Sequence, residues 1–407
     1  MRSATFTLTI FLALTSACLL AQKKTSTTSE ESLNDTTNKS ATVIGGYGNA
    51  FYQRNSKEQT SRINLERFVL FTGHKFNDKI SFFSELEVED AKVAGGEEGG
   101  EVAVEQAYLK FNLNANQYIT AGLFLPRIGI LNEEHLPNTF NGNERNYVET
   151  YILPSTWREL GIGFYGSMST MPLNYSFGLF NGLNSGGFEH GSGIREGRFE
   201  GRNASANNLA VTAAVQYNPG DFKFQVSGYY GGTVGDSKRR ADSLGLNSGI
   251  FGTPVAIGEA DVQYEHNGFS VKVLGAIVSI PDAEAINSAY ASNTPKTEYG
   301  AYAEIGYDLF HNISAPHQKQ LIVFVRDEKF DVNAQIPSNG VMDGTLSQNH
   351  VVAGFTYLPI RNVAIKADVR LVHTGSQNPE LIVNPNPVAL PYQPNYNLVN
   401  FGIALSF

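Results

Sequence analysis

The chain has 407 residues, a formal net charge of −9 and one cysteine. The acidic balance and the lack of a basic patch exclude nucleic-acid binding. With 40 Gly, 19 Tyr, 26 Phe and only 17% charged residues, the composition favours one large all-β domain over several soluble ones.

Residues 1–21 have the layout of a secretory signal peptide. Arg2 precedes an apolar run that is too short to span a membrane as a helix, and small residues follow it. We favour cleavage after Ala21, with cleavage after Ala17 and a lipidated Cys18 as alternatives. Cleavage after Ala21 would leave a chain without cysteine, which excludes disulfides and a thiol nucleophile.

Residues 22–41 are rich in Ser, Thr, Asn, Lys and Glu, which predicts a disordered leader. From residue 42 to residue 407, apolar and polar side chains alternate in one segment after another. In one such segment Phe222, Phe224 and Val226 alternate with Lys223, Gln225 and Ser227. A two-residue period of this kind predicts β-strands with one apolar and one polar face.

The connections between these segments alternate between short and long. Short turn signals occur at Asn77-Asp78, Asn114-Ala115-Asn116, Ser169-Thr170, Pro219-Gly220-Asp221, His266-Asn267-Gly268 and Pro359-Ile360-Arg361-Asn362. Longer polar stretches lie near residues 54–60, 91–100, 125–156, 183–205, 233–252, 281–296, 328–346 and 374–394.

Short turns at one end and long loops at the other are typical of an outer-membrane β-barrel. A soluble β-sandwich would mix both kinds of connection at each end. No apolar stretch after the signal peptide approaches the ~20 residues of a spanning helix. We therefore predict an all-β fold: a transmembrane antiparallel β-barrel of about 16 strands over residues 42–407, in the outer membrane of a Gram-negative bacterium.

The C-terminal segment supports this prediction. Apolar residues at 399, 401, 403, 405 and 407 alternate with small or polar ones up to the last residue, Phe407. A barrel closes its first strand on its last, so the final strand should be full length. Its end resembles the C-terminal signature of bacterial outer-membrane proteins, which implies that Phe407 is read by the barrel assembly machinery.

Residues 122–166 resemble the corresponding region of porins related to the phosphate-selective porin family, especially the Bacteroidetes type. The matching positions are Gly122, Phe124, Pro126, Asn132, Glu133, His135, Pro137, Phe140, Arg145, Pro154 and Trp157. The resemblance implies a homotrimeric sixteen-stranded channel in outer-membrane lipid, with its third long loop folded inward to narrow the pore.

The composition of residues 125–156 supports an inward loop independently. The stretch carries too many apolar side chains for a solvated loop, so it should pack against the inner wall. Charged groups that would then line a constriction, and could set up a transverse field or tie the loop to the wall, are Arg127, Glu133, Glu134, His135, Glu144, Arg145, Glu149 and Arg158.

The polar strand faces supply the predicted charges of the lumen: Lys79, Glu85, Glu87, Lys110, Lys223, Glu259, Asp261, Lys272, Glu304, Lys366, Asp368 and Arg370. Glu89, Glu265, Glu298, Asp308 and Arg326 fall on the same faces, so acids outnumber bases. Since anion selectivity needs rings of Arg or Lys, we predict a weakly cation-preferring or unselective pore rather than a phosphate channel.

Two charged residues do not fit the simplest strand register. Arg67 and Glu105 fall on the predicted lipid face, where a basic residue at the bilayer midplane would cost ~2 to 4 kcal/mol. Either they lie near the interface or in a trimer contact, or the register is wrong there.

The predicted function is that of an outer-membrane porin that lets small hydrophilic solutes or ions diffuse passively. The alternative is a non-conducting barrel that acts as an adhesin or surface-binding protein. Adjacent residues such as Glu133, Glu134 and His135 rarely converge on one ion, so no metal or cofactor is expected. The sequence has no Gly-x-Ser-x-Gly motif, so no enzyme is expected.

Overall fold

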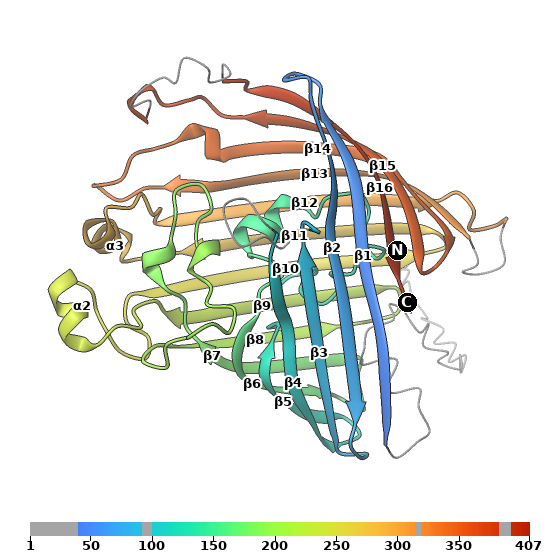
Figure 1. Ribbon diagram of the computed structural model, residues 1–407, viewed down its shortest axis with the longest axis horizontal. Helices are drawn as coiled ribbons and strands as arrows, with labels where there is room; N and C mark the ends of the chain where they lie inside the picture. Colours follow the sequence, from blue (N-terminus) through green and yellow to red (C-terminus); the bar gives the residue numbers. More distant parts are fainter. Residues whose placement is uncertain (1–39, 92–99, 314–318, 382–391) are drawn as a thin grey trace, which may run out of the picture.

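A computed structural model of the chain describes residues 40–91, 100–313, 319–381 and 392–407. These residues form a closed antiparallel barrel of sixteen strands (Figure 1), which confirms the predicted fold class. Each strand pairs with its neighbours in the sequence, and β1 (Ala41–Asn55) closes the barrel on β16 (Asn395–Ser406). The predicted signal peptide and nearly all of the predicted leader lie outside the described residues.

The remaining strands follow one another in sequence around the barrel. They are β2 (Thr60–Lys75), β3 (Ile80–Glu89), β4 (Val102–Asn114), β5 (Gln117–Phe124), β6 (Glu159–Ser167), β7 (Leu173–Asn181), β8 (Leu209–Tyr217), β9 (Phe222–Gly232), β10 (Pro254–His266), β11 (Phe269–Ser279), β12 (Thr297–Asp308), β13 (Gln320–Gln335), β14 (Ser347–Ile360) and β15 (Val363–Thr374). Helices lie in the long connections: η1 (Val148–Ile152), η2 (Ser185–Gly187), η3 (Arg195–Gly197), α2 (Lys238–Leu244), α3 (Ala283–Tyr290), η4 (Gly344–Leu346) and η5 (Pro379–Leu381). None of the helices within the described residues is long and apolar enough to cross a membrane.

All six predicted short turns connect consecutive strands, but one predicted loop begins too early. The stretch 328–346 was expected to be a connection, whereas β13 continues to Gln335. At this end of β13 the charged side chains of Asp327 and Lys329 are exposed on the outer face, while the apolar Phe330 and Val332 are buried inside. Because this pattern is the reverse of the usual one, the end of β13 is not recognisable as a strand from the sequence.

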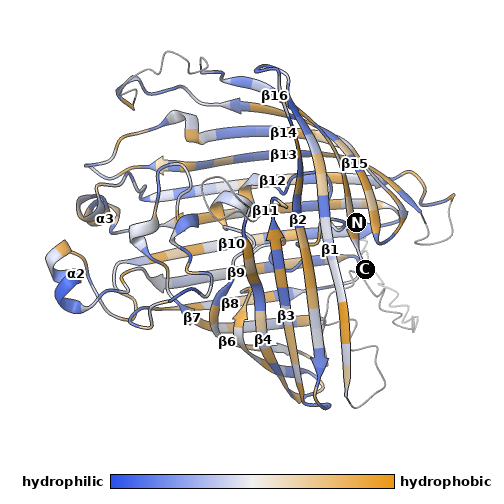
Figure 2. Cartoon of the chain, viewed as in Figure 1, coloured by the Kyte–Doolittle hydropathy of each residue, from blue (hydrophilic) through white to orange (hydrophobic). Residues whose placement is uncertain are grey.

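Hydrophilic and hydrophobic residues alternate along the strands (Figure 2), and the two faces of the barrel differ in polarity as this alternation predicts. On β16, Phe401 and Ile403 are 54% and 55% exposed on the outer face, and neighbouring Asn400 is fully buried inside. Phe407 exchanges two backbone hydrogen bonds with Gly46 of β1, so the chain is paired up to its last residue. The apolar outer face is the surface that such a barrel presents to lipid.

Arg67 and Glu105 both lie on the inner face, because each strand contains a β-bulge. In β2, residue 66 is an extra residue between residue 65 and Arg67, which both pair with β1. In β4, Glu105 is an extra residue between residue 104 and Gln106, which both pair with β3. One extra residue moves the following side chains to the opposite face. The two side chains are 8% and 0% exposed. The outward register was therefore wrong at both positions.

A large apolar cluster lies inside the barrel, against β9 to β13. Ile128, Ile152 and Trp157 are each 0% exposed there and pack with wall residues such as Leu274 and Val278. The apolar residues between β5 and β6 are thus buried against the inner face, as their composition predicts.

Candidate functional site

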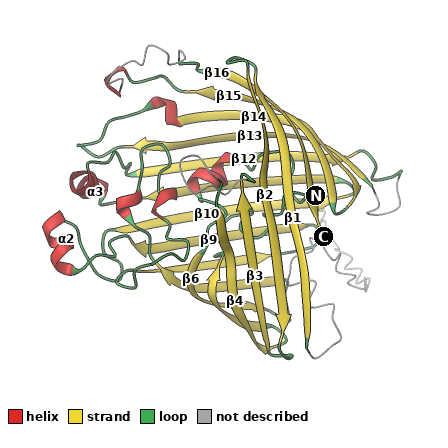
Figure 3. Ribbon diagram, in the orientation of Figure 1, coloured by secondary structure: helices red, strands yellow, loops and turns green. Residues whose placement is uncertain are grey.

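Residues 125–158, which connect β5 to β6, are called the inner segment below. They contain η1, which contacts β11, β12 and β13 and is drawn against these strands in Figure 3. Wall glycines make room for this packing: a Cβ on Gly300 would lie 2.9 Å from Val148 and 3.1 Å from Ile152 of η1. Similarly, a Cβ on Gly402 would clash with the side chain of Asn143.

Strand β15 binds the middle of the inner segment through Lys366 and Asp368. The Lys366 ammonium donates hydrogen bonds to the carbonyl oxygens of Pro137, Phe140 and Gly142 at 2.5, 2.7 and 2.8 Å. Asp368 Oδ2 accepts hydrogen bonds from the backbone and side-chain nitrogens of Asn143 at 2.8 and 2.6 Å. These buried charges hold the segment rather than face open solvent.

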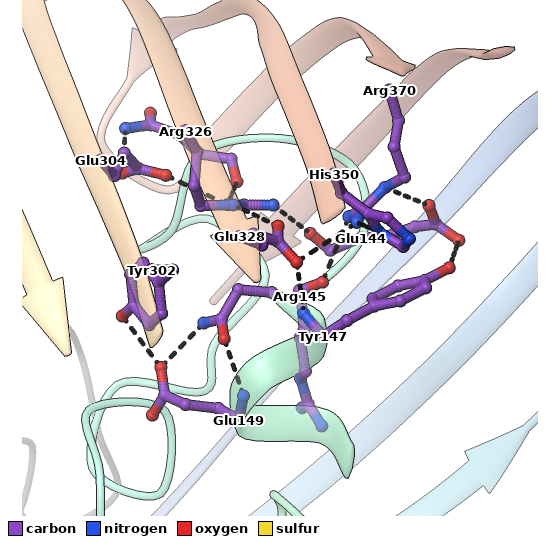
Figure 4. Close-up of polar contacts among 12 residues, drawn as sticks. Glu144, Arg145, Tyr147, Glu149, Tyr302, Glu304, Arg326, Glu328, His350 and Arg370 are labelled. Atoms are coloured by element: carbon purple, nitrogen blue, oxygen red, sulfur yellow. Dashed lines mark hydrogen bonds and ion pairs between the residues drawn. The ribbon is translucent and has the colours of Figure 1, made fainter. Parts of the chain in front are cut away.

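A charged network joins the inner segment to β12, β13 and β15 (Figure 4). Arg370 lies 3.3 Å from Glu144 of the segment and 3.4 Å from Glu328 of β13. Arg326 bridges Glu328, at 2.6 Å, and Glu304, at 3.0 Å. The wall members Arg326, Glu328 and Arg370 are at most 3% exposed on their side chains, so each charge depends on its partners.

Two further residues, Tyr147 and His350, extend the network in Figure 4. The backbone nitrogen of Tyr147 donates to Glu328 Oε2 at 2.7 Å, and the Arg370 guanidinium lies 4.2 Å from the centre of the Tyr147 ring. His350 Nδ1 lies 2.9 Å from Arg370 Nη1.

Glu149, a predicted constriction residue, is fully buried and binds groups of the fold. Its Oε1 accepts from the backbone nitrogens of Ile130 and Leu131, each at 2.6 Å. Its Oε2 accepts from Asn146 at 2.7 Å and from the hydroxyl of Tyr302 at 3.0 Å. Burial raises the pKa of Glu149 in spite of these hydrogen bonds. Its geometry is that of a structural group.

Glu133 and Glu134 pair with bases on both sides. Glu133 lies 2.5 Å from Arg127 and 3.3 Å from Lys223 of β9, and Glu134 lies 3.4 Å from Lys272 of β11. Burial by itself would raise the pKa of Glu133, but Arg127 and Lys223 outweigh it and hold the pKa below the usual value. The side chains of Glu133 and Lys223 are each 25% exposed, more than the other pairs between the segment and the wall strands described above.

Arg158 is held by the connection between β7 and β8, a contact that the sequence pattern does not predict. Glu200 lies 3.3 Å from Arg158 and 3.1 Å from Arg198. Arg195 and Arg198 also donate to carbonyl oxygens of residues 150 and 154–156. The connection between β7 and β8 therefore also holds the inner segment in place.

His135 faces β3 and β4. Its Nε2 lies 3.7 Å from Glu85, and the hydroxyl of Tyr47 donates to Glu105 at 2.9 Å and to Glu85 at 3.3 Å. Burial lowers the pKa of His135, but Glu85 and Glu105 outweigh this effect and raise it. Arg145 donates to the backbone oxygen of His135 at 3.4 Å and lies near Arg67 and Glu105.

Eleven of the twelve predicted lumen charges lie on inner strand faces: Glu85, Glu87, Lys110, Lys223, Glu259, Asp261, Lys272, Glu304, Lys366, Asp368 and Arg370. Lys79 is the exception, because β3 begins at residue 80 and Lys79 is exposed in the preceding turn. Glu328, predicted to lie in a loop, and the wall glycines were not among the predicted site residues; the signal for the glycines was their position on a polar strand face.

The fold resembles solved porin barrels. An anion-selective porin from Comamonas acidovorans has a TM-score of 0.52 at 10% identity, covering 90% of this chain and 100% of that one. OmpF of Salmonella typhi in complex with daunomycin has a TM-score of 0.53 at 13% identity, covering 91% and 98%. The trimer form of OmpT of Vibrio cholerae has a TM-score of 0.50 at 9% identity, covering 91% and 100%. At these identities the likeness concerns the fold.

The closed sixteen-stranded barrel with its apolar outer face defines the chain as an outer-membrane β-barrel protein of a Gram-negative bacterium. It belongs to the same family as an uncharacterized protein of Aquifex aeolicus (strain VF5). The two are 31% identical over 343 residues, which cover 81% of this chain and 75% of that protein. The chain matches no model of a known protein family, so its relation to phosphate-selective porins stays a prediction.

Proposed function

We propose that this protein is a porin: a passive, non-enzymatic channel for small hydrophilic solutes or ions, with the inner segment as its constriction. The observation that carries the proposal is the packing of residues 125–158 on the inner wall through buried ion pairs. A porin fold with a segment fixed across its interior would limit solutes by size.

The charges of the lumen favour cations. Acids outnumber bases on the inner faces, and several bases are neutralised by carboxylates of the inner segment, as Lys223 and Lys272 are by Glu133 and Glu134. Glu259 and Asp261 lie side by side on β10 with buried carboxylate oxygens that have no hydrogen-bond partner among the described residues. This pattern is the reverse of an anion-selective lumen.

We also propose a homotrimer in outer-membrane lipid, inserted by the barrel assembly machinery through Phe407. The trimer form of a barrel with the same fold supports the first part. The exposed, β-paired terminal strand supports the second.

One observation favours a second function, a closed barrel that binds partners through its long loops. The inner segment contacts β1, where the rings of His135 and Tyr47 lie 5.9 Å apart, and it contacts β8 and β9 as well as β11 to β15. A cavity of about 20 Å³ between it and β11 to β13 has room for about one water molecule. Contacts on so many strands leave little free space around the segment.

Single-channel recording of the purified protein in a planar bilayer, with a KCl gradient, separates the two functions. A porin gives stable steps, in threes for a trimer, with a reversal potential of cation-selective sign. Correctly folded protein that carries no current contradicts the porin and supports the closed barrel. An anion-selective reversal potential contradicts the charge assignment alone.

A further inference from the structure

Glu85 of β3, Glu105 of β4 and His135 of the inner segment come together although they lie far apart in the sequence. One nitrogen or oxygen atom from each lies within 4.8 Å of the other two. All three side chains are buried, with exposures of 7%, 0% and 6%.

The imidazole of His135 has no hydrogen-bond partner on either ring nitrogen among the described residues, and neither does Glu105 Oε1. Buried polar atoms are nearly always hydrogen-bonded, so several orphaned atoms in one place point to a further partner such as a water or an ion. Tyr47, whose hydroxyl donates to both carboxylates, holds Glu85 and Glu105 in position. Carboxylates that bind a metal ion are typically held by such hydrogen bonds.

The charge around this cluster is unbalanced. Five carboxylates lie around three guanidinium groups: Glu66, Glu85, Glu87, Glu89 and Glu105 with Arg67, Arg145 and Arg158. The formal surplus is two negative charges. An imidazolium at His135 would cancel one of them, whereas a divalent cation would cancel both while His135 stays neutral. Unpaired buried charge is strongly unfavourable, so charge balance favours the divalent ion.

We propose that Glu85, Glu105 and His135 form a site for one divalent transition-metal ion of the Zn²⁺ or Mn²⁺ type. One imidazole and two carboxylates suit these ions better than Ca²⁺ or Mg²⁺, which take oxygen ligands. The 3.7 Å between His135 Nε2 and Glu85 Oε2 is close to the ~3.4 Å that separates two ligands on one tetrahedral ion with bonds of ~2.1 Å. The ion would join the inner segment to two wall strands.

Metal binding to the purified full chain in detergent tests the site. After removal of metal with EDTA, Zn²⁺ is added and its binding measured by calorimetry and by metal analysis of the dialysed protein. We expect one Zn²⁺ per chain, and a loss of affinity of more than about 100-fold for His135→Ala and for Glu105→Gln, because loss of a supporting partner alone typically costs about 10- to 100-fold.

Two matched controls should keep the affinity of the parent protein. Glu133→Gln removes a carboxylate two residues from His135 that pairs elsewhere. His350→Gln removes a buried histidine whose two ring nitrogens both have partners. No stoichiometric Zn²⁺ in the parent protein, or equal affinity in the His135 variant, overturns the proposal.

A spectroscopic measurement on the parent protein covers the case in which the variants fail to fold. Cu²⁺ added at one equivalent should show the hyperfine coupling of one imidazole nitrogen in its electron paramagnetic resonance spectrum. A spectrum without nitrogen coupling, or with coupling that survives in a folded His135→Ala protein, contradicts the assignment.

Discussion

Replacing Lys366 by methionine should release the inner segment from the wall. The ammonium of Lys366 is the donor for three carbonyl oxygens, of Pro137, Phe140 and Gly142, and it lies 4.2 Å from the centre of the Phe140 ring. Methionine keeps most of the volume but donates no hydrogen bond. At ~1 kcal/mol for each buried carbonyl left without a donor, the packed position of the segment loses about 3 kcal/mol.

A loss of this size multiplies the population of the detached segment by about 100. Trypsin cleavage within the segment, after Arg145, should therefore accelerate by about the same factor while opening remains fast relative to cleavage. Mass spectrometry of the fragments gives the rate. Lys79→Met, in an exposed turn, is the matched control and should leave the rate unchanged. If Lys366→Met forms a normal barrel and is cleaved no faster than the parent protein, these hydrogen bonds do not hold the segment.

Three further predictions concern packing, pH and selectivity. Gly300→Leu should lower the free energy of unfolding by about 1–3 kcal/mol, because the leucine side chain would overlap η1. The control Gly275→Leu should not, because a Cβ at this position would meet no atom within 4 Å. Equal melting temperatures of the two variants would contradict the packing of η1 on Gly300. Because the pKa of Glu133 is lowered in the folded protein, its ion pairs stabilise the segment above the ordinary value near 4.3 and are lost as the pH falls through the folded-state pKa. The contribution of Glu133 to the conductance should thus be constant at neutral pH and change only below that ordinary value, and Glu133→Gln should remove this low-pH change. A low-pH change of the same size in the parent channel and in the Glu133→Gln channel would refute this reasoning. Finally, Glu259→Gln combined with Asp261→Asn should move the reversal potential toward zero. For ideal cation selectivity this potential is about 59 mV in a tenfold KCl gradient. An unchanged potential would show that these carboxylates do not face the permeating ions.

The strands and their faces could be predicted from the sequence because both depend on local patterns. The alternation at Phe222 and its neighbours, the turn at Asn77-Asp78 and the apolar positions of the last strand are all visible within about ten residues. A two-residue period places side chains on opposite faces of a strand wherever the strand lies. The apolar content of residues 125–156 likewise predicted burial before any partner was known.

The tertiary structure decided the register at the bulges and the partners of the inner segment. Arg67 and Glu105 face inward because an extra residue in each strand is accommodated against the neighbouring strand, which a single strand's sequence does not reveal. Lys366 reaches Pro137 across 229 positions of the chain, and His135 meets Glu85 and Glu105 from another segment. Periodicity is a property of neighbours in sequence, whereas charge pairing inside a closed barrel depends on which strands lie opposite each other, and only the closed barrel determines that.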